Sequence, residues 1–383
     1  MRLLFVADGR SQTARNWIRH FAEDGAEVYL ASTFECTLDF PVRELQYTPV
    51  AFSGLKRRSG PSATRGIGLR SAIRHYLGPL TIPRAAHRLR DFIERVRPDL
   101  VHAMRIPYEG MLAADAFAEA PLVVSVWGND FTRHASSGRL MRHYTRWTMQ
   151  VANALHADCQ RDIRLGRQWG FDPAKPTLVA PGNGGIRREV FFPPVRPVDA
   201  PVVFNPRGFR AYVRNDSFFR AIPLVLASRP ETRFICAAMA NEPQALAWIR
   251  EFDLEGVVEL LPALPQGEMA DVYRRAQLMV SPSLHDGTPN TLLEAMACGC
   301  LPVAGDLESI REWIRPGENG LLADASDARS LADAILQGLE DKDLRGRAAG
   351  LNQELIIERA EYSENMRRVE EFYAGLVRDS LSP

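Results

Sequence analysis

The chain lacks the long apolar runs of a membrane protein. No run within its 383 residues reaches the length of about 18 to 20 residues that spans a bilayer. The opening M-R-L-L-F-V-A-D-G carries a single charge before a strand-length apolar stretch, which does not fit a signal peptide. Hydrophobic residues make up 46% of the chain and charged residues 25%, as in ordinary globular proteins. We therefore expect a cytoplasmic protein.

Cysteine is scarce and unevenly spaced. The five cysteines are an odd number, and the C-x-C at residues 298–300 has no second pair and no histidine spacing to match it. This pattern argues against both a disulfide framework and a zinc site. The chain also has no G-x-G-x-x-G near its first strand, so a nicotinamide or flavin site is not expected. We expect no metal and no cofactor.

Short apolar runs alternate with helix-like stretches along the whole chain. Residues 2–7, 98–103, 121–126, 202–206 and 278–280 have the composition of buried strands. Such alternation predicts an α/β protein whose sheets are parallel and covered by helices, among them one at 108–119. Because 383 residues exceed one ordinary core, two domains are expected.

Charge divides unevenly between the two halves. Residues 1–187 hold 26 lysines and arginines against 17 acids, whereas the remainder is acidic by the same margin. The segment 56–90 contributes nine basic residues and no acid. Two interpretations stay open for it: a solvated loop, or a cationic surface for an anionic acceptor or for anionic lipids. Nucleic acid is not an expected partner, since no recognised binding module accompanies the charge.

The most informative stretch runs from Leu278 to Val303. An apolar strand leads into Asp286-Gly287-Thr288-Pro289-Asn290, and a helix-forming series follows. Glycine and proline let a loop approach a ligand, and the first amides of the helix, at Asn290, Thr291 and Leu292, favour an anion such as phosphate. Glu294 is placed to accept hydrogen bonds from hydroxyls of the same ligand. The alternative is that Asp286 is a turn residue and Glu294 a solvated first-turn acid.

The run D-G-T-P-N-T-L-L-E-A-M-A-C-G-C-L-P-V resembles the donor-site signature of family 4 of the retaining glycosyltransferases. Asp286 stands where that family usually has glutamate. The resemblance implies the GT-B fold: two Rossmann-like domains facing each other across a cleft, with a C-terminal helix that crosses back. On this basis we expect an acceptor domain at 1–187 joined by 362–383, and a donor domain at 198–361.

The resemblance also implies the donor-site residues. Glu294 would hold the ribose, and Asp286 would contact the transferred sugar. The loop residues Gly287, Thr288, Pro289, Asn290 and Thr291 would line the sugar and diphosphate, with the loop's amides as donors. Arg207 matches the family's diphosphate arginine, and Arg214 is the replacement for a lysine absent from this loop, with Arg210 beside them. Leu264 falls in the segment that binds the base. Catalysis is assigned to Arg207, Arg214 and Asp286.

Acceptor-side residues are expected where strands of the first domain end. The loop after the first strand offers Gly9 and Arg10, and two later strand ends offer His102 and the pair Asn129 and Asp130. A histidine common in the family is Trp127 here, so no imidazole is expected to act at that position.

The predicted function is a retaining, metal-independent glycosyltransferase. It would move a sugar from a nucleotide-diphospho-sugar, with UDP as the expected nucleotide, to a glycan or lipid-linked acceptor, and could touch the inner face of a membrane. Two alternatives stay open: a sugar-nucleotide epimerase, which would need acid and base groups such as His102, His134 or His285, and a silent sugar-nucleotide binding module. Phosphorylases of this fold need a lysine for pyridoxal phosphate, and the chain has only three lysines.

Overall fold

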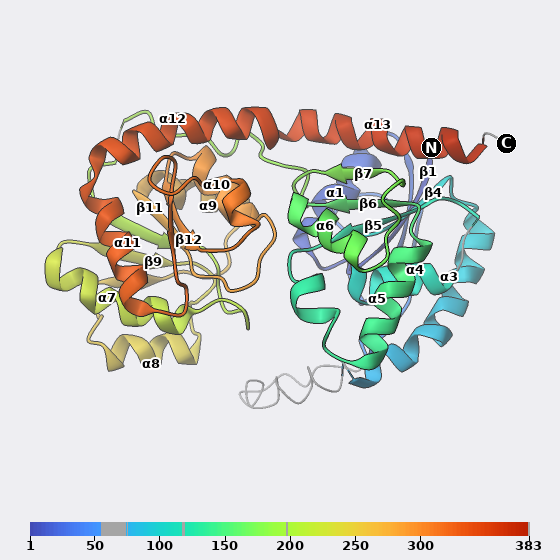
Figure 1. The fold of residues 1–383 in the computed structure, drawn as a ribbon, viewed down its shortest axis with the longest axis horizontal. Coiled ribbons are helices and arrows are strands. Elements are labelled where there is room, and N and C mark those ends of the chain that lie inside the picture. Colours follow the sequence, from blue (N-terminus) through green and yellow to red (C-terminus); the bar gives the residue numbers. More distant parts are fainter. Residues whose placement is uncertain (55–73, 75, 117–118, 197, 382–383) are drawn as a thin grey trace. The chain divides into compact units, whose positions relative to one another are not determined.

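The protein is described by a computed structural model that covers residues 1–54, 74, 76–116, 119–196 and 198–381. It forms two compact units (Figure 1). The first unit holds residues 1–184 and 366–383, and the second holds 185–365. Much of the basic segment 56–90 lies outside the described residues.

The first unit is a seven-stranded parallel sheet in the order β3-β2-β1-β4-β5-β6-β7. Strands β1, β4, β5 and β6 are buried along nearly their whole length, because helices cover both faces of the sheet. The elements of this unit are β1 (Arg2–Ala7), α1 (Gln12–Glu23), β2 (Glu27–Ser32), β3 (Glu44–Tyr47), η1 (Gly78–Thr81), α3 (Ile82–Val96), β4 (Leu100–Ala103), η2 (Ile106–Gly110), α4 (Met111–Ala116), β5 (Leu122–Val126), η3 (Asp130–His134), α5 (Arg139–Val151), β6 (Ala154–Ala157), α6 (Gln160–Gln168) and β7 (Thr177–Val179).

The second unit is a six-stranded parallel sheet in the order β10-β9-β8-β11-β12-β13. Its central strand β11 is fully buried, as the apolar run of the sequence predicts. The elements are β8 (Val202–Asn205), α7 (Asn215–Ser228), β9 (Arg233–Cys236), α8 (Pro243–Glu251), β10 (Val258–Leu260), α9 (Gln266–Arg275), β11 (Leu278–Ser281), α10 (Asn290–Ala297), β12 (Leu301–Gly305), η4 (Ile310–Glu312), β13 (Leu321–Ala323), α11 (Ala328–Glu340) and α12 (Lys342–Arg359).

The boundary between the units lies after Gly184, slightly before the position that the sequence indicated. The connector that follows belongs to the second unit for two reasons. Ile186 pairs with Glu361 in a short parallel bridge, and Phe191 packs into the second unit's core. These contacts attach the start of the proline-rich connector to the second unit.

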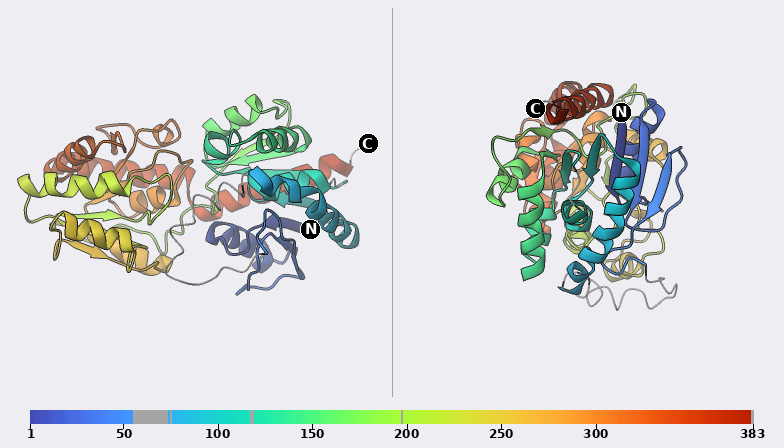
Figure 2. Two further views of the ribbon diagram at one scale, coloured as in Figure 1. Left: turned by 90° about the horizontal axis from the view of Figure 1, so that it is seen from below. Right: turned by 90° about the vertical axis from the view of Figure 1, so that its right-hand side faces the viewer.

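Helix α13 (Tyr362–Leu381) returns the chain to the first unit, and both chain ends lie in that unit (Figures 1 and 2). Its Tyr373 is fully buried, and the Trp17 indole N–H donates to the Tyr373 oxygen over 3.0 Å. Arg368 donates to the carbonyl of Val179 over 3.3 Å. The helix thus packs between α1 and β7.

A chain of polar groups continues from Tyr373 into the core. Burial lowers the pKa of His102 and lowers that of His156 to about 4, so both rings are neutral. His156 Nε2 faces the Ala180 carbonyl at 3.0 Å and must donate to it, so His156 Nδ1 accepts from the Ser125 hydroxyl at 2.8 Å. Ser125 in turn accepts from His102 Nε2 at 2.7 Å, and His102 Nδ1 accepts from Tyr373. Each donor in this buried row has one acceptor.

One predicted element differs. The helix expected at 108–119 is replaced by a tight π turn at 106–110, and α4 begins only at Met111. Pro107 and Tyr108 leave the helical region of backbone angles, with Tyr108 at φ 72° and ψ −53°. This turn lies directly after β4, at the edge of the sheet where ligands bind in folds of this type.

Candidate functional site

The donor-side loop follows β11 at the carboxyl edge of the second sheet. Helix α10 begins at Asn290, and Pro289 occupies its N-cap without a side-chain hydrogen bond to the first turn. The amides of Asn290 and Thr291 therefore keep their hydrogen-bonding capacity for a ligand, and the helix dipole favours a negative one. The Leu292 amide, in contrast, donates to the Pro289 carbonyl over 2.9 Å. Gly287, Thr288 and Pro289 are buried, whereas Asn290 and Thr291 are half-buried.

Arg207 reaches this loop from the end of β8. One guanidinium nitrogen lies 2.6 Å from Asp286 Oδ2, and the other donates to Thr291 Oγ1 over 3.1 Å. The arginine side chain is only 7% exposed and that of Asp286 14%, so the pair is largely desolvated. The structure thus brings together three residues that the sequence assigned to the donor site.

Glu294 lies on the second turn of α10 and is buried. Burial raises the pKa of its carboxyl to about 7, against lowering by the Tyr273 hydroxyl and the Arg207 charge. Tyr273 Oη lies 3.1 Å from Glu294 Oε2 and 3.2 Å from the Thr291 carbonyl. The carboxyl is therefore held in place and titrates near neutral pH, and it is not a solvated first-turn acid.

Arg214 and Arg210 occupy the loop between β8 and α7. The Arg214 amide donates to the Pro282 carbonyl over 2.8 Å, which places its backbone beside the end of β11. Its guanidinium grips both oxygens of Asp216, at 2.8 and 2.7 Å, and this hydrogen-bonded pairing lowers the pKa of Asp216. Arg210 is exposed and donates to the Arg207 carbonyl over 3.3 Å. Arg214 is thus paired with Asp216 next to it in the sequence, whereas Arg207 is paired with Asp286 of the donor-side loop.

Three residues that shape the loop escaped the sequence analysis. Trp313 donates its indole N–H to Thr288 Oγ1 over 2.9 Å, and Ser309 donates to the Asp286 carbonyl over 2.8 Å. Tyr273 supports Glu294 as described above. All three lie far from the loop in sequence, and no motif marks them. The Thr288 hydroxyl therefore serves the fold of the loop. Leu264 is half-buried just beyond the end of β10.

The first unit has a cavity of about 310 Å³, which we call the first-unit cavity. It lies where β1, β4 and β5 end, as the topology of a parallel sheet predicts for a ligand site. Its lining residues are Asp8, Arg10, Ser11, Ala14, Phe34, Arg74, Met104, Arg105, Pro107, Tyr108, Glu109, Trp127 and His134. Arg10 is thus the one predicted acceptor-side residue in this lining.

Of the other acceptor-side predictions, those for His102 and Asp130 need correction, whereas those for Asn129 and Gly9 stay predictions. His102 is fully buried in the polar row described above, because both faces of β4 are covered, and it cannot contact an acceptor there. Asp130 is also buried, and it accepts hydrogen bonds from Arg105 and from the amides of Ile106 and Trp127. Asn129 accepts from Arg105 over 3.0 Å. Gly9 is a packing position, since a Cβ there would come within 2.3 Å of Cys36 Sγ.

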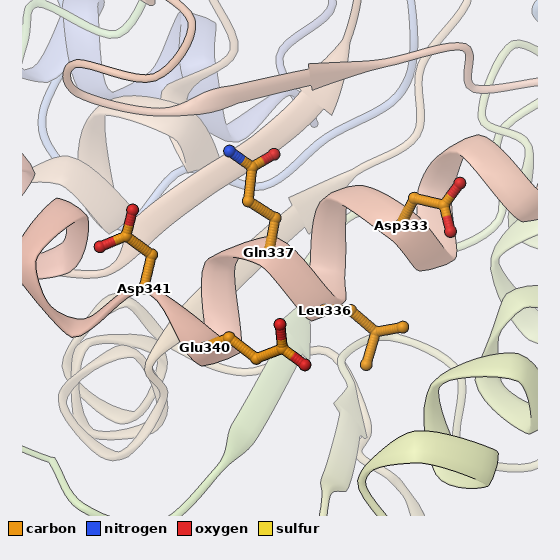
Figure 3. A pocket seen from close by; sticks show the side chains of 5 residues that line it. All are labelled: Asp333, Leu336, Gln337, Glu340 and Asp341. Carbon is orange, nitrogen blue, oxygen red and sulfur yellow. The ribbon is translucent and has the colours of Figure 1, made fainter.

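Two further features of the structure are weaker candidates for a ligand site. A shallow depression along α11 is lined by Asp333, Leu336, Gln337, Glu340 and Asp341 (Figure 3), and its acidic wall does not suit a diphosphate. Among the described residues, a potential metal-ligand cluster comprises Asp158, Cys159 and Asp162 in the first unit. Arg161 already pairs with Asp162 at 2.8 Å within that cluster.

Comparison with known families decides the assignment. The family described as glycosyl transferase 4-like domain matches residues 8–182, and the family described as glycosyl transferases group 1 matches residues 206–341. Models of glycosyltransferase families thus match a segment of each unit. This confirms the resemblance to family 4 that the donor-side loop indicated.

Curated proteins similar to this chain include a D-inositol 3-phosphate glycosyltransferase of Thermobispora bispora, 30% identical over 51% of the chain and 50% of the relative. The O-antigen chain mannosyltransferase B of Escherichia coli is 35% identical over 26% of each chain. The chain thus spans about half the length, or less, of these curated relatives.

Solved structures confirm the GT-B fold. Sucrose-phosphate synthase of Thermosynechococcus elongatus aligns over 99% of the chain and 100% of its own, with a TM-score of 0.76 and 16% identity. HepE of Anabaena, solved with UDP-glucose, aligns over 98% and 100% with a TM-score of 0.73 and 16% identity. In the described part of the chain, no helix is long and apolar enough to cross a membrane.

Proposed function

We propose that this protein is a retaining, metal-independent glycosyltransferase that moves a sugar from a nucleotide-diphospho-sugar to a hydroxyl of a glycan or glycolipid. The observation that carries the proposal is the buried Arg207, which contacts Asp286 and Thr291 at the start of α10. A guanidinium and an uncapped helix end at one point form a site for a diphosphate.

In the proposed reaction, the bond between the anomeric carbon and the diphosphate oxygen breaks while the acceptor oxygen bonds to the same face of that carbon. The acceptor proton passes to a phosphate oxygen of the leaving group. Arg207, Arg214 and the α10 amides stabilise the growing negative charge, so the protein supplies the electrostatic role that a metal could otherwise fill. Asp286, fixed by Arg207, orients the transferred sugar, and Glu294 accepts hydrogen bonds from the ribose.

The relatives support the proposed classes of donor and acceptor. HepE was solved with UDP-glucose, which supports a UDP-sugar as donor. The mannosyltransferase named for an O-antigen chain supports a glycan acceptor. The alternative of an epimerase loses one of its acid-base candidates, since His102 lies in the core.

We further propose a cytoplasmic protein that touches the inner face of a membrane. The described residues beside the basic segment support this, because Tyr76, Leu77 and Leu80 are 63%, 48% and 63% exposed. The exposed Arg84 and Arg88 follow directly. Exposed apolar side chains next to arginines suit an anionic lipid surface.

A panel of nucleotide-sugars incubated with the enzyme tests the function without a known acceptor. We expect slow hydrolysis of one UDP-sugar, with retention of anomeric configuration when an alcohol replaces water, and with activity that survives chelation by EDTA. An isomerised but still nucleotide-linked sugar would indicate an epimerase. Tight binding without any turnover would indicate a silent module.

A further inference from the structure

The segment around η4, residues 309–313, holds the donor-side loop at two points. Ser309 Oγ donates to the Asp286 carbonyl over 2.8 Å, and Trp313 Nε1 donates to Thr288 Oγ1 over 2.9 Å. The loop lies between β11 and α10, whereas this segment follows β12, so the two bonds join parts of the chain that are more than twenty residues apart. Both bonds go to the loop itself and leave the side chains of Arg207 and Glu294 for other contacts.

The bond between Trp313 and Thr288 is buried. Only 5% of Trp313 and 4% of Thr288 are exposed. Trp313 also packs in the same core cluster as Leu292 and Leu293 of α10, so its ring has little freedom to turn. Water replaces a buried hydrogen bond poorly, and the indole N–H therefore holds the Thr288 side chain in one orientation.

Arg359, the last residue of α12, holds the Trp313 ring from a second direction. Its guanidinium lies 4.1 Å from the ring centroid, at a distance where a cation and an indole attract each other. The same side chain donates to the Glu312 carbonyl over 2.8 Å. The end of α12 is itself fixed, because the Ala360 carbonyl accepts from the Ile186 amide over 2.7 Å.

The backbone of Trp313 is tied to α12 as well. Its carbonyl accepts from Asn319 Nδ2 over 2.9 Å, and the same nitrogen lies 2.9 Å from Asn352 Oδ1 on α12. Asn352 Nδ2 returns a bond to the Asn319 carbonyl over 3.0 Å. Side chain and backbone of Trp313 are thus both constrained, so the residue presents its N–H to the loop at a fixed place.

The part of the loop that Trp313 restrains follows Asp286. Arg207 binds the Asp286 carboxylate, and Tyr273 contacts Glu294, so the residues proposed for the diphosphate and the ribose have supports of their own. Gly287 has wide backbone freedom, and the stretch after it needs an anchor to keep one conformation. An anchor that is in place before the donor arrives reduces the conformational entropy that binding must remove.

We propose that Trp313 is a positioning residue of the donor site: its indole N–H fixes Thr288, and with it the part of the loop that meets the transferred sugar, while Arg359 holds the ring in place. This inference rests on the proposed function, because it takes a nucleotide-sugar as the donor. Trp313 acts through Thr288, so its loss should weaken the contribution of the sugar to binding and spare that of the nucleotide.

Isothermal titration calorimetry on the full chain separates these two contributions. The probes are UDP, UDP-glucose, UDP-galactose and UDP-N-acetylglucosamine, and the sugar nucleotide that wild type binds most tightly is compared with UDP. Thr288→Val and Trp313→Phe each remove one partner of the hydrogen bond. We expect each to raise the Kd for the sugar nucleotide about fivefold and to leave the Kd for UDP within about twofold of wild type.

Three further comparisons distinguish positioning from general stability. Thr288→Ser keeps the hydroxyl and should bind both ligands like wild type. The double variant Thr288→Val with Trp313→Phe should lose no more affinity than either single variant, because all three lack the same bond. Thr232→Val is the matched control, since Thr232 is also buried in the second unit and its hydroxyl has no hydrogen-bond partner in the described part of the chain.

Arg359→Gln removes the guanidinium from the Trp313 ring and should also weaken sugar-nucleotide binding more than UDP binding. Arg315→Gln is its control, because the Arg315 side chain is 82% exposed, and it should bind both ligands like wild type.

Thermal unfolding of each variant shows whether it is folded. The proposal is overturned if wild type binds no sugar nucleotide of the panel, or if folded Thr288→Val and Trp313→Phe bind it as tightly as wild type. It is also overturned if the two variants lose affinity for UDP by the same factor, or if their effects add in the double variant. Failure of the proposed function would appear separately, as sugar-nucleotide binding by wild type without hydrolysis.

Discussion

Glu294 shows how burial turns a common helix residue into a titrating group near neutral pH. Its folded pKa of about 7 lies above the ordinary value of 4.5. In the unfolded chain the carboxyl ionises as pH rises through its ordinary value, whereas the folded protein keeps it protonated until about 7. The stability that the neutral form contributes is therefore full below pH 4.5 and is lost as pH rises through 7.

Glu294→Gln should remove this dependence. Relative to wild type, we expect the variant to gain about 3 kcal/mol of unfolding free energy between pH 4.5 and pH 8. It should also bind UDP more weakly than wild type at pH 8, because an amide is a poorer acceptor for ribose hydroxyls than a carboxylate. Denaturant titrations and calorimetry at the two pH values measure both effects. If the unfolding free energies of wild type and Glu294→Gln change with pH in the same way, Glu294 is not the titrating group. If UDP affinity is unchanged, Glu294 does not bind the ribose.

Replacing Arg207 and replacing Arg214 by alanine should change the free energy of unfolding by different amounts. Arg207→Ala leaves the poorly exposed Asp286 without its partner and should cost about 3 kcal/mol, whereas the more exposed pair of Arg214 with Asp216 should cost under about 1 kcal/mol. Both variants should lower the turnover of donor hydrolysis more than donor affinity, because charge on the diphosphate grows in the transition state. Equal losses in the two quantities would instead indicate uniform binding.

Among the elements, β12 and the donor-side loop come closest together at Gly305. A Cβ there would lie 2.2 Å from the Ser283 carbonyl oxygen, so the loop before Asp286 would have to move. We expect Gly305→Ala to destabilise the protein by about 1 to 3 kcal/mol and to weaken UDP binding.

Gly346 on α12 is the control for this change. A Cβ at that position meets nothing within 4 Å, so Gly346→Ala should stabilise the protein by about 0.5 to 1 kcal/mol and leave UDP binding unchanged. Chemical denaturation and calorimetry measure both variants. If Gly305→Ala binds UDP like Gly346→Ala, the loop does not depend on this contact.

Elements and their order could be predicted from the sequence more fully than side-chain directions. The run from β11 to α10 is short, so local propensity and loop chemistry determine it, and Glu294 follows from its spacing. Arg207 lies outside this run, and only the family resemblance pointed to it. Tyr273, Trp313 and Ser309 could not be predicted, because they reach the loop only through the tertiary fold. His102 was misplaced for a related reason: a strand end locates a residue at the sheet edge, but covering helices decide whether its side chain is accessible.

At the scale of the whole molecule, the buried row from Trp17 to His156 makes the first unit sensitive to acid. The unfolded chain takes up protons on its histidines as pH falls below 6.5, while folded His156 stays neutral until about 4. The contribution of His156 to stability is thus present above pH 6.5 and is lost between these values, at about 1.4 kcal/mol per pH unit.

His156→Gln removes the titrating ring. The stability advantage of wild type over this variant should shrink as pH falls from 7 to 4, as measured by denaturant titration across that range. His87→Gln, which removes an exposed imidazole, is the control. A constant difference between wild type and His156→Gln would show that the row does not couple to pH.

Membrane contact is a further property of the whole molecule. We expect sedimentation with anionic vesicles to fall as salt rises, since exposed charges are screened over about 8 Å at physiological salt. Leu77→Ser with Leu80→Ser should reduce binding, whereas Leu351→Ser with Ile357→Ser, which replaces similarly exposed residues on α12, should not. If both double variants bind anionic vesicles equally well, the residues around Leu77 and Leu80 form a solvated surface and not a membrane contact.

Because α13 returns to the first unit, that unit can be completed only at the end of translation. His102 and Tyr373 are separated by 271 residues, which a ribosome adds in about 15 to 50 seconds. In the later part of that interval, once β7 has been made, the first unit has its sheet but not the tyrosine that accepts from Trp17 and donates to His102. A nascent chain stopped before α13 would expose the surface of α1 that this helix covers, and chaperones and proteases would meet the protein in that form.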